Sequence, residues 1–509
     1  MSIGNFVKRM RDIMRQDAGI NGDAQRIEQL TWMLFLKIYD DAEAVWELDP
    51  KHPYESVIPE EMRWRNWADT SVGNKAALKG DELLDFVNNR LFPTLQNLQL
   101  PPNCPRRKAI VKVVFEDIHN FMKDGVQFRE MLELINEFNF DDPREAHAFG
   151  QIYETILREL QSAGSAGEYY TPRALTDFMA AHVGLTLDDK VADLACGTGG
   201  FLNSARKLLD KVAAAGTNED REKLSKAFYG IEKKPLPYLL CVTNMLLNGV
   251  DEPNIRHGNS LTQNVLDFKE SDRFDVILMN PPYGGSEKES VQQNFPASFR
   301  SSETADLFMA LITYRLKNKG RAAVVVPDGF LFGSGAKANI KKRLMEDFNL
   351  HTVVRLPTSV FAPYTSIATN ILFFDRPSAE VEKERESETS KAQGPVTKET
   401  WFYRVDMPEG YKHFSKTKPM LLEHLNDLAA WWNDRKPIEM GGFDKARAFT
   451  AKELADNGYD LDLCGFPQEE EEILPPKELI EKYQAAREQH ERKMDKVLAE
   501  ILTKIGGGE

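Results

Sequence analysis

A short segment in the middle of the chain combines an amide side chain, two prolines and an aromatic ring. The mainly apolar run Phe274–Met279 ends abruptly in Asn280, Pro281, Pro282 and Tyr283. Two prolines cannot continue a sheet ladder or a helix interior, so they stiffen the backbone and leave its carbonyl oxygens free. The amide and carbonyl oxygens are hydrogen-bond acceptors, and the ring is a stacking surface. Because ligands bind beyond the carboxyl ends of strands in open α/β sheets, the pattern predicts a ligand site; a strand that prolines merely stop is the alternative.

A glycine-rich segment earlier in the chain is typical of a strand-to-helix turn that approaches a ligand. Lys190–Gly200 reads KVADLACGTGG, with Asp193 after a short apolar run and three glycines around Thr198. A helical sequence begins at Phe201. Glycines allow a ligand to come close to the backbone at a helix N-terminus. The spacing is not G-x-G-x-x-G, because the second and third glycines are adjacent, and a plain turn is the alternative.

An acidic residue, Glu232, follows the next predicted strand in the sequence AFYGIEKK. At the end of the second strand of a βαβ unit, such a residue is placed to accept hydrogen bonds from both hydroxyls of a ribose. A solvated strand end is the alternative. The ribose-binding interpretation of Glu232 is favoured because the glycine turn precedes it at βαβ spacing.

Taken in order, these motifs carry a family resemblance. GEYYTP (Gly167–Pro172) lies upstream of the glycine turn and NPPY lies downstream. This order resembles the gamma group of adenine-N6 DNA methyltransferases, which use S-adenosylmethionine. The segments LTWMLFLKIYDD, RAAVVVPDGFLF and LPTSVFAPYTSIATNILFF extend the likeness to the modification (M) subunit of type I restriction-modification systems. The resemblance covers nearly the whole chain and is weakest toward the C-terminus.

The resemblance implies S-adenosyl-L-methionine as the cofactor and assigns roles to particular residues. Asp193 would lie near the amino group of the cofactor, Glu232 would accept from its ribose, and Asn259 would lie near its adenine. The full set assigned to the cofactor is Tyr170, Thr171, Asp193, Ala195, Gly197, Thr198, Gly199, Glu232 and Asn259, with the first two at the methionine end.

The resemblance also implies the reaction. Hydrogen bonds from an adenine N6 amino group to the Asn280 side-chain oxygen and the Pro281 carbonyl would make that nitrogen more nucleophilic and align it with the methyl–sulfur bond. The target base must rotate out of the duplex, and Tyr283 would stack on it. Phe361 lies in a segment where an aromatic often packs against the flipped base, although aromatics there are equally core residues. No metal is required for this chemistry.

Two other function classes stay open at this point. N-P-P-Y also occurs in enzymes that methylate RNA bases or glutamine amides of proteins, and the quartet alone does not choose between planar amino groups. A non-catalytic interaction subunit with a vestigial cofactor site is the second alternative. The sequence contains no H-E-x-x-H, G-x-S-x-G or Walker A motif, so metalloprotease, hydrolase and helicase interpretations lack support.

Strand ends marked by glycine and proline in the middle of the chain predict an α/β fold. Together with the resemblance, this implies a Rossmann-like S-adenosylmethionine-dependent methyltransferase core with an α-helical N-terminal domain and a C-terminal helical tail. The expected division is 1–160, 161–420 and 421–509. Apolar positions between Ile27 and Ile38 recur at mixed three- and four-residue spacing, which predicts a buried helix.

Three further segments carry expectations about local structure. A helix is predicted from about Pro143, with Phe149 and Tyr153 on its apolar face. The charged segment 378–395 is expected to be an exposed loop or linker. A terminal amphipathic helix is predicted after Pro476.

Net charge and composition limit which partners and which cellular compartment are expected. The formal net charge of −14 argues against nucleic acid when it is taken for the whole chain. The excess of acidic residues lies in the two flanks, however, and the middle segment is nearly neutral. No apolar run suggests a membrane span, and four scattered cysteines suit a reducing cytoplasm.

The C-terminal segment shows no basic, aromatic-rich DNA reader. The resemblance implies that a separate specificity (S) subunit reads the DNA, with two M subunits per S and restriction (R) subunits in the larger complex. The isolated chain is then expected to bind cofactor but to hold DNA poorly until S is added.

Overall fold

The computed structural model describes residues 3–50, 53–69, 78–138, 153, 170–386 and 394–465. It also describes ten positions between 477 and 495. The chain divides into two compact units, Met1–Gly465 and Phe466–Glu509. Within the described part, none of the helices has the length and apolar character that a membrane span needs.

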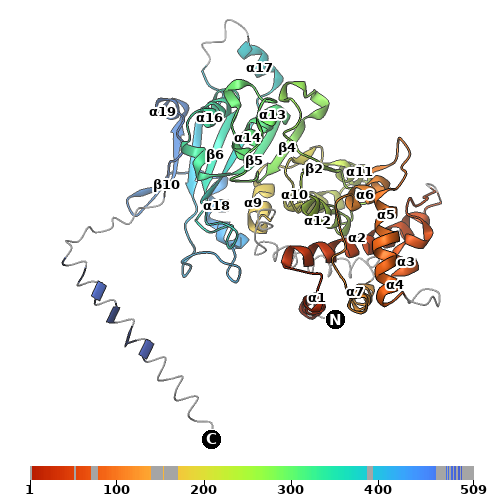
Figure 1. Ribbon diagram of the computed structural model, residues 1–509. Helices are drawn as coiled ribbons and strands as arrows, with labels where there is room; N and C mark the ends of the chain where they lie inside the picture. Colours follow the sequence, from red (N-terminus) through yellow and green to blue (C-terminus); the bar gives the residue numbers. More distant parts are fainter. Residues whose placement is uncertain are drawn as a thin grey trace. The chain divides into compact units, whose positions relative to one another are not determined.

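Helices alone make up the described N-terminal part of the first unit, as predicted (Figure 1). They include one π-helical segment, η2, and one short 3-10 helix, η1. In chain order these elements are α1 (Ile3–Gln16), α2 (Asp23–Glu47), η1 (Glu60–Met62), α3 (Trp64–Trp67), α4 (Gly80–Asp85), η2 (Phe86–Leu91), α5 (Phe92–Gln96), α6 (Arg106–Phe115) and α7 (Gly125–Asn136).

Helix α2 confirms the buried helix predicted from its apolar spacing. The spacing buries side chains all round the helix, so polar residues inside it need partners. Lys37 pairs with Asp41 one turn later at 2.6 Å, and the Gln29 side-chain oxygen accepts from the Phe121 amide at 2.8 Å. Helix α2 packs against α7 and against α12 (Pro235–Leu247), which belongs to the sheet-bearing part of the unit.

The helix predicted from about Pro143 lies outside the described residues, apart from Tyr153. That residue is fully buried and donates a hydrogen bond from its hydroxyl to the Leu240 carbonyl in α12, at 2.9 Å.

Ten strands form one sheet in the order β3-β2-β1-β4-β5-β7-β6-β8-β10-β9. The first five in this order run parallel, which confirms the Rossmann-like α/β core, while β7 is antiparallel to β5 and β6. The strands are β1 (Val191–Asp193), β2 (Phe228–Glu232), β3 (Ile255–His257), β4 (Phe274–Met279), β5 (Leu316–Pro327), β6 (Asn349–Arg355), β7 (Thr369–Asp375), β8 (Glu399–Arg404), β9 (Ile438–Met440) and β10 (Phe443–Thr450).

Helices cover both faces of the sheet (Figure 1), so a central strand is buried on both sides. In β4 the side chains alternate between two cores. Val276 and Leu278 join the core that contains α10 (Gly200–Ala214) and α12, whereas Ile277 and Met279 join the core of α14 (Thr304–Arg315). Burial on both faces explains why β4 reads as a mainly apolar run.

The remaining helices lie before, between or after these strands in the chain. They are α9 (Arg173–His182), α11 (Asn218–Lys226), η4 (Val265–Asp267), η5 (Glu270–Asp272), α13 (Glu289–Gln292), η6 (Ala297–Phe299), α15 (Asp328–Phe332), α16 (Ala336–Glu346), α17 (Ala379–Glu386), η8 (Leu422–Leu425), α18 (Asn426–Trp432) and α19 (Ala451–Asp456).

The segment expected to be an exposed linker is helical in its first part, so that prediction is wrong for α17. Glu382 in this helix accepts a pair of hydrogen bonds from the Arg376 guanidinium, at 2.7 and 3.1 Å, and a third from Asn318 at 2.9 Å. These bonds hold a polar helix against the end of β7 although it buries little apolar surface. Residues 387–393 lie outside the described part.

Strands near the C-terminus continue the sheet beyond the expected division at residue 420. Strand β10 pairs with β8 over five residue pairs, and β8 pairs in parallel with β6. In the second unit, the described positions between 477 and 495 are helical and exposed.

Candidate active site

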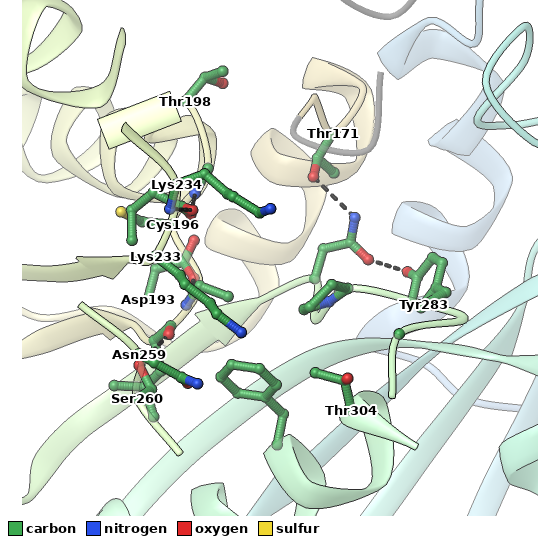
Figure 2. A pocket seen from close by; sticks show the side chains of 18 of the residues that line it. Thr171, Asp193, Cys196, Thr198, Lys233, Lys234, Asn259, Ser260, Tyr283 and Thr304 are labelled. Atoms are coloured by element: carbon green, nitrogen blue, oxygen red, sulfur yellow. Dashed lines mark hydrogen bonds between the residues drawn. The ribbon is translucent and has the colours of Figure 1, made fainter. Parts of the chain in front are cut away.

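A cavity of about 440 Å³ lies where the parallel strands β1, β2 and β4 end, and its wall contains most of the residues singled out in the sequence (Figure 2). Parallel strands bring their carboxyl ends to one sheet edge, so residues distant in the sequence meet there. The predicted residues that line the cavity are Thr171, Asp193, Ala195, Gly197, Thr198, Glu232, Asn259, Asn280, Pro282 and Tyr283.

The glycine turn joins β1 to α10 in left-handed backbone conformations. Gly197 has φ +52° and Gly199 has φ +77°, which glycine adopts without steric cost. A Cβ atom at Gly199 would also lie 2.9 Å from the Cys241 sulfur. Position 199 therefore requires glycine for two reasons, its backbone conformation and the nearby sulfur. The turn places the N-terminus of α10 at the cavity.

Asp193 ends β1 with a buried carboxyl group. Its Oδ1 accepts a hydrogen bond from the Ala195 amide at 3.1 Å. Burial raises the pKa of the Asp193 carboxyl well above its usual value, and the nearby carboxylate of Glu232 raises it further. A hydrogen-bond donor or a cation that entered the cavity would stabilise the ionised form.

Glu232 holds two turns together. Its Oε2 accepts from the Gly197 amide at 2.9 Å, and its Oε1 accepts from the Lys234 amide at 2.8 Å. The side chain is buried, and burial raises its pKa. Each carboxylate oxygen has a second lone pair, so Glu232 keeps acceptor capacity toward the cavity while it fixes the glycine turn.

Asn259 and Ser260 form the wall after β3. The Asn259 Oδ1 accepts from the Leu261 amide at 3.0 Å, which leaves the amide nitrogen of Asn259 as a donor. Ser260 donates from Oγ to the Leu194 carbonyl at 2.5 Å and so ties this loop to the end of β1.

The NPPY segment begins one residue after β4 ends. The Asn280 amide nitrogen donates to Thr171 Oγ1 at 3.1 Å, and the Tyr283 hydroxyl donates to Asn280 Oδ1. The dashed lines in Figure 2 mark these two bonds. Burial raises the pKa of the Tyr283 hydroxyl well above its usual value, so this group stays a protonated donor at neutral pH.

Four predicted residues lie near the cavity without lining it. Gly199 belongs to the turn that approaches the cavity, and Pro281 is buried. Tyr170 is buried beneath the guanidinium of Arg173, 5.2 Å from its ring centroid. Phe361 is also buried, and its ring meets Tyr283 edge to face at a centroid distance of 6.2 Å. Phe361 thus supports the ring of Tyr283. Of GEYYTP, only the part from Tyr170 lies among the described residues.

Other lining residues were missed by sequence reasoning. Lys233 and Lys234 directly follow Glu232, and Figure 2 shows both side chains extending from the end of β2 toward the middle of the cavity. Lys233 forms an ion pair with Glu287 at 3.1 Å, which joins the β2 end to the loop after NPPY. The sequence EKKP was a usable signal for the lysines. Phe308 and Tyr364 also line the cavity, but no local pattern distinguishes them from core aromatics.

A family model described as N-6 DNA Methylase matches residues 144–473, more than half of the chain, and a model described as HsdM N-terminal domain matches residues 3–138. The chain is 45% identical over 487 residues to the EcoEI methylase subunit of a type I restriction enzyme from Escherichia coli, covering 95% of this chain and 94% of that protein.

The chain belongs to the N-6 DNA methylase family.

Solved structures that resemble this chain also come from type I restriction-modification systems. A modification subunit of a putative type I restriction enzyme from Vibrio vulnificus YJ016 has 39% identity and a TM-score of 0.75, over 91% of this chain and 96% of that one. A chain from a study of type I complex assembly and conformational transition has 34% identity and a TM-score of 0.78, over 100% and 99%. This methylase subunit therefore shares the fold and the length of type I modification subunits.

Proposed function

We propose that this type I methylase subunit transfers a methyl group from S-adenosyl-L-methionine to the N6 amino group of adenine in DNA. One observation carries the proposal: the NPPY amide borders the same cavity as the glycine turn and two buried carboxyl groups. A nucleophile-binding element and a cofactor-sized pocket therefore share one space. Membership of the N-6 DNA methylase family supports this choice of reaction.

The donors and acceptors of the cavity fit this cofactor. Asp193 and Glu232 are buried carboxyl groups whose pKa values are raised by burial, so each gains from a hydrogen-bond donor. The ammonium group and the ribose hydroxyls of S-adenosylmethionine are such donors. Asn259 offers its amide nitrogen toward an adenine ring, because its oxygen is held by Leu261. When bound, the cofactor supplies an electrophilic methyl group on a sulfonium.

The residues of the chain would orient and activate the acceptor. Asn280 Oδ1 and the Pro281 carbonyl would accept the two N6–H hydrogen bonds of a flipped adenine, which favours a more tetrahedral nitrogen and aims it into the cavity. Orientation of this kind lowers a bimolecular barrier by about 7–11 kcal/mol at best. Tyr283, supported from behind by Phe361, would stack on the base. Rotating the base out of the duplex costs a few kcal/mol.

The partners belong to the same proposal. As a type I subunit, the chain would act in the cytoplasm on DNA that a specificity subunit recognises, with two methylase subunits per specificity subunit, and restriction subunits would join the larger complex. The near-neutral charge of the middle segment supports phosphate contacts that are shared with a partner. Methylation of the recognised sites would protect host DNA from cleavage.

Substitution of Asn280 tests the reaction. The chain is assembled with its specificity subunit, and transfer of a radiolabelled methyl group to DNA is measured beside cofactor binding by calorimetry. Asn280→Ala should bind the cofactor within about twofold of the wild type and lose at least about 100-fold in turnover, the range seen when an oriented polar group at a reacting centre is removed. Asn433→Ala, an exposed asparagine after α18, is the matched control.

The outcomes separate the remaining functions. Label that enters RNA or protein glutamine while DNA stays unlabelled would contradict the DNA substrate. Cofactor binding without transfer to any acceptor would identify a non-catalytic subunit. Full activity of Asn280→Ala would remove the NPPY amide from the mechanism.

A further inference from the structure

The side chain of Asn280 is held between two hydroxyl groups. Its Nδ2 donates to Thr171 Oγ1 at 3.1 Å, and its Oδ1 accepts from the Tyr283 hydroxyl. Thr171 lies 109 positions away in the chain and directly precedes Pro172, the N-cap of α9. The amide is therefore clamped between the α9 entrance and its own NPPY turn.

An asparagine amide needs such a clamp, because its terminal torsion is broad and its two ends are nearly equal in size. In one orientation the oxygen faces the base and accepts a hydrogen bond from an amino group. In the flipped orientation an NH2 group would face the amino group of the base, and two donors would meet. Only the first orientation supports transfer.

The two hydroxyls are not equivalent in setting this orientation. Tyr283 lies three residues from Asn280 on the same turn, and its hydroxyl bonds to the oxygen to which we assign the target amino group, so this contact must be shared or broken when a base enters. Thr171 is held by α9, which packs against α10 and thus against the glycine turn. Thr171 is the contact that can persist while the base is bound.

We propose that Thr171 is a positioning residue: its hydroxyl oxygen accepts from Asn280 Nδ2 and so keeps Asn280 Oδ1 facing the target amino group. This inference rests on the proposed function and deepens it. It gives Thr171 a role beyond the contact with the methionine end of the cofactor that the family resemblance implies. The Thr171 oxygen accepts the hydrogen bond from the Asn280 amide, and the hydroxyl hydrogen can then be donated to a cofactor in the cavity.

The test separates turnover from cofactor binding. Thr171→Val keeps the shape of the side chain but removes the acceptor, whereas Thr171→Ser keeps the acceptor. At saturating cofactor and DNA, Thr171→Val should lower kcat by about five- to tenfold, as expected for the loss of one net hydrogen bond. Thr171→Ser should restore kcat to within about twofold. Thr176→Val, one turn along α9, is the matched control, because its hydroxyl bonds to Arg173 and Ser204 and not to Asn280.

A double-mutant cycle adds a readout that a merely structural role would not move. In an Asn280→Ala background, Thr171→Val should cause no further loss of kcat, because the group that it positions is gone. Additive losses would overturn the inference, as would a Thr171→Val variant with wild-type kcat and only a raised cofactor KM. Failure of the proposed function looks different, because then the wild-type complex itself would transfer no methyl group to DNA.

Discussion

The hydroxyl of Tyr283 donates a hydrogen bond to Oδ1 of Asn280, the oxygen to which we assign the target amino group. In this structure the aromatic residue of NPPY thus occupies the acceptor that the substrate needs. An incoming adenine must share this oxygen with the hydroxyl or displace it. The ring of Tyr283 packs edge to face against Phe361, which holds the ring beside this oxygen.

Removal of the hydroxyl alone should be tolerated. Tyr283→Phe keeps the ring and the contact with Phe361 and removes the competing donor, so kcat should stay within about threefold of the wild type, with KM for DNA unchanged or lower. Tyr283→Ala loses a stacking surface worth about 1–3 kcal/mol, so kcat/KM should fall by about 5- to 150-fold. Steady-state methylation of one DNA duplex measures both variants. Equal losses in Phe and Ala would instead make the hydroxyl essential.

Glu232 should affect cofactor binding in two ways, through its hydrogen bonds to the backbone amides of two turns and through its own contact with the cofactor. In Glu232→Gln one carboxylate oxygen becomes an NH2 group, which would face the amide of Gly197 or Lys234 as donor against donor. We expect a loss of about 1–3 kcal/mol in the free energy of unfolding and at least about a tenfold weaker cofactor affinity. Thermal unfolding and calorimetric titration measure the two effects.

A matched change on the cavity rim serves as the comparison for this variant. Glu287→Gln removes only the charge that pairs with Lys233. The Glu287 side chain is 10% exposed but its partner Lys233 is 54% exposed, so we expect a smaller loss of stability than in Glu232→Gln. If Glu287→Gln weakened folding as much as Glu232→Gln, the two backbone bonds would not explain the role of Glu232.

The N-terminal helical part should lose stability between acid and neutral pH because of Glu28. Burial raises the pKa of this carboxyl in the folded chain to about 7, against an ordinary value of 4.5. The folded state then binds more protons than the unfolded state between these values, so stability falls as pH rises through this window. The cost is absent below about pH 4.5 and complete above about pH 7.

Removing the charge tests this dependence. Glu28→Gln should match the wild type near pH 4.5 and be more stable by about 2 kcal/mol near pH 8, from about 1.4 kcal/mol per pKa unit reduced for partial exposure. Denaturant unfolding across this pH range measures the difference. A constant offset between the two proteins at every pH would contradict a titrating Glu28.

The helices, strands and turns that carry the site follow from short-range patterns. A mainly apolar run that ends at two prolines predicted β4 with its observed ends. The glycine spacing predicted the turn before α10, because only glycine adopts the turn's backbone conformation without steric cost. The interpretation of 378–395 as a linker failed for α17 because bonds from Arg376 and Asn318 to Glu382 hold that helix. Asn318 lies on β5 and Arg376 directly follows β7, and such side-chain partners leave no periodic signal in the sequence.

Taken by itself, the sequence determined which residue types would reach the sheet edge, and the resemblance of its motifs implied the reaction. Only the tertiary structure decided how these residues face one another. It turned the Asn280 amide toward Thr171, set Phe361 behind Tyr283, and engaged Glu232 with the amides of two turns. It also brought Lys233 into the wall of the cavity. Motif spacing constrains the backbone through local geometry, whereas the direction of a side chain is set by hydrogen bonds and packing with partners that can lie far away in the sequence, as Thr171 lies 109 positions from Asn280.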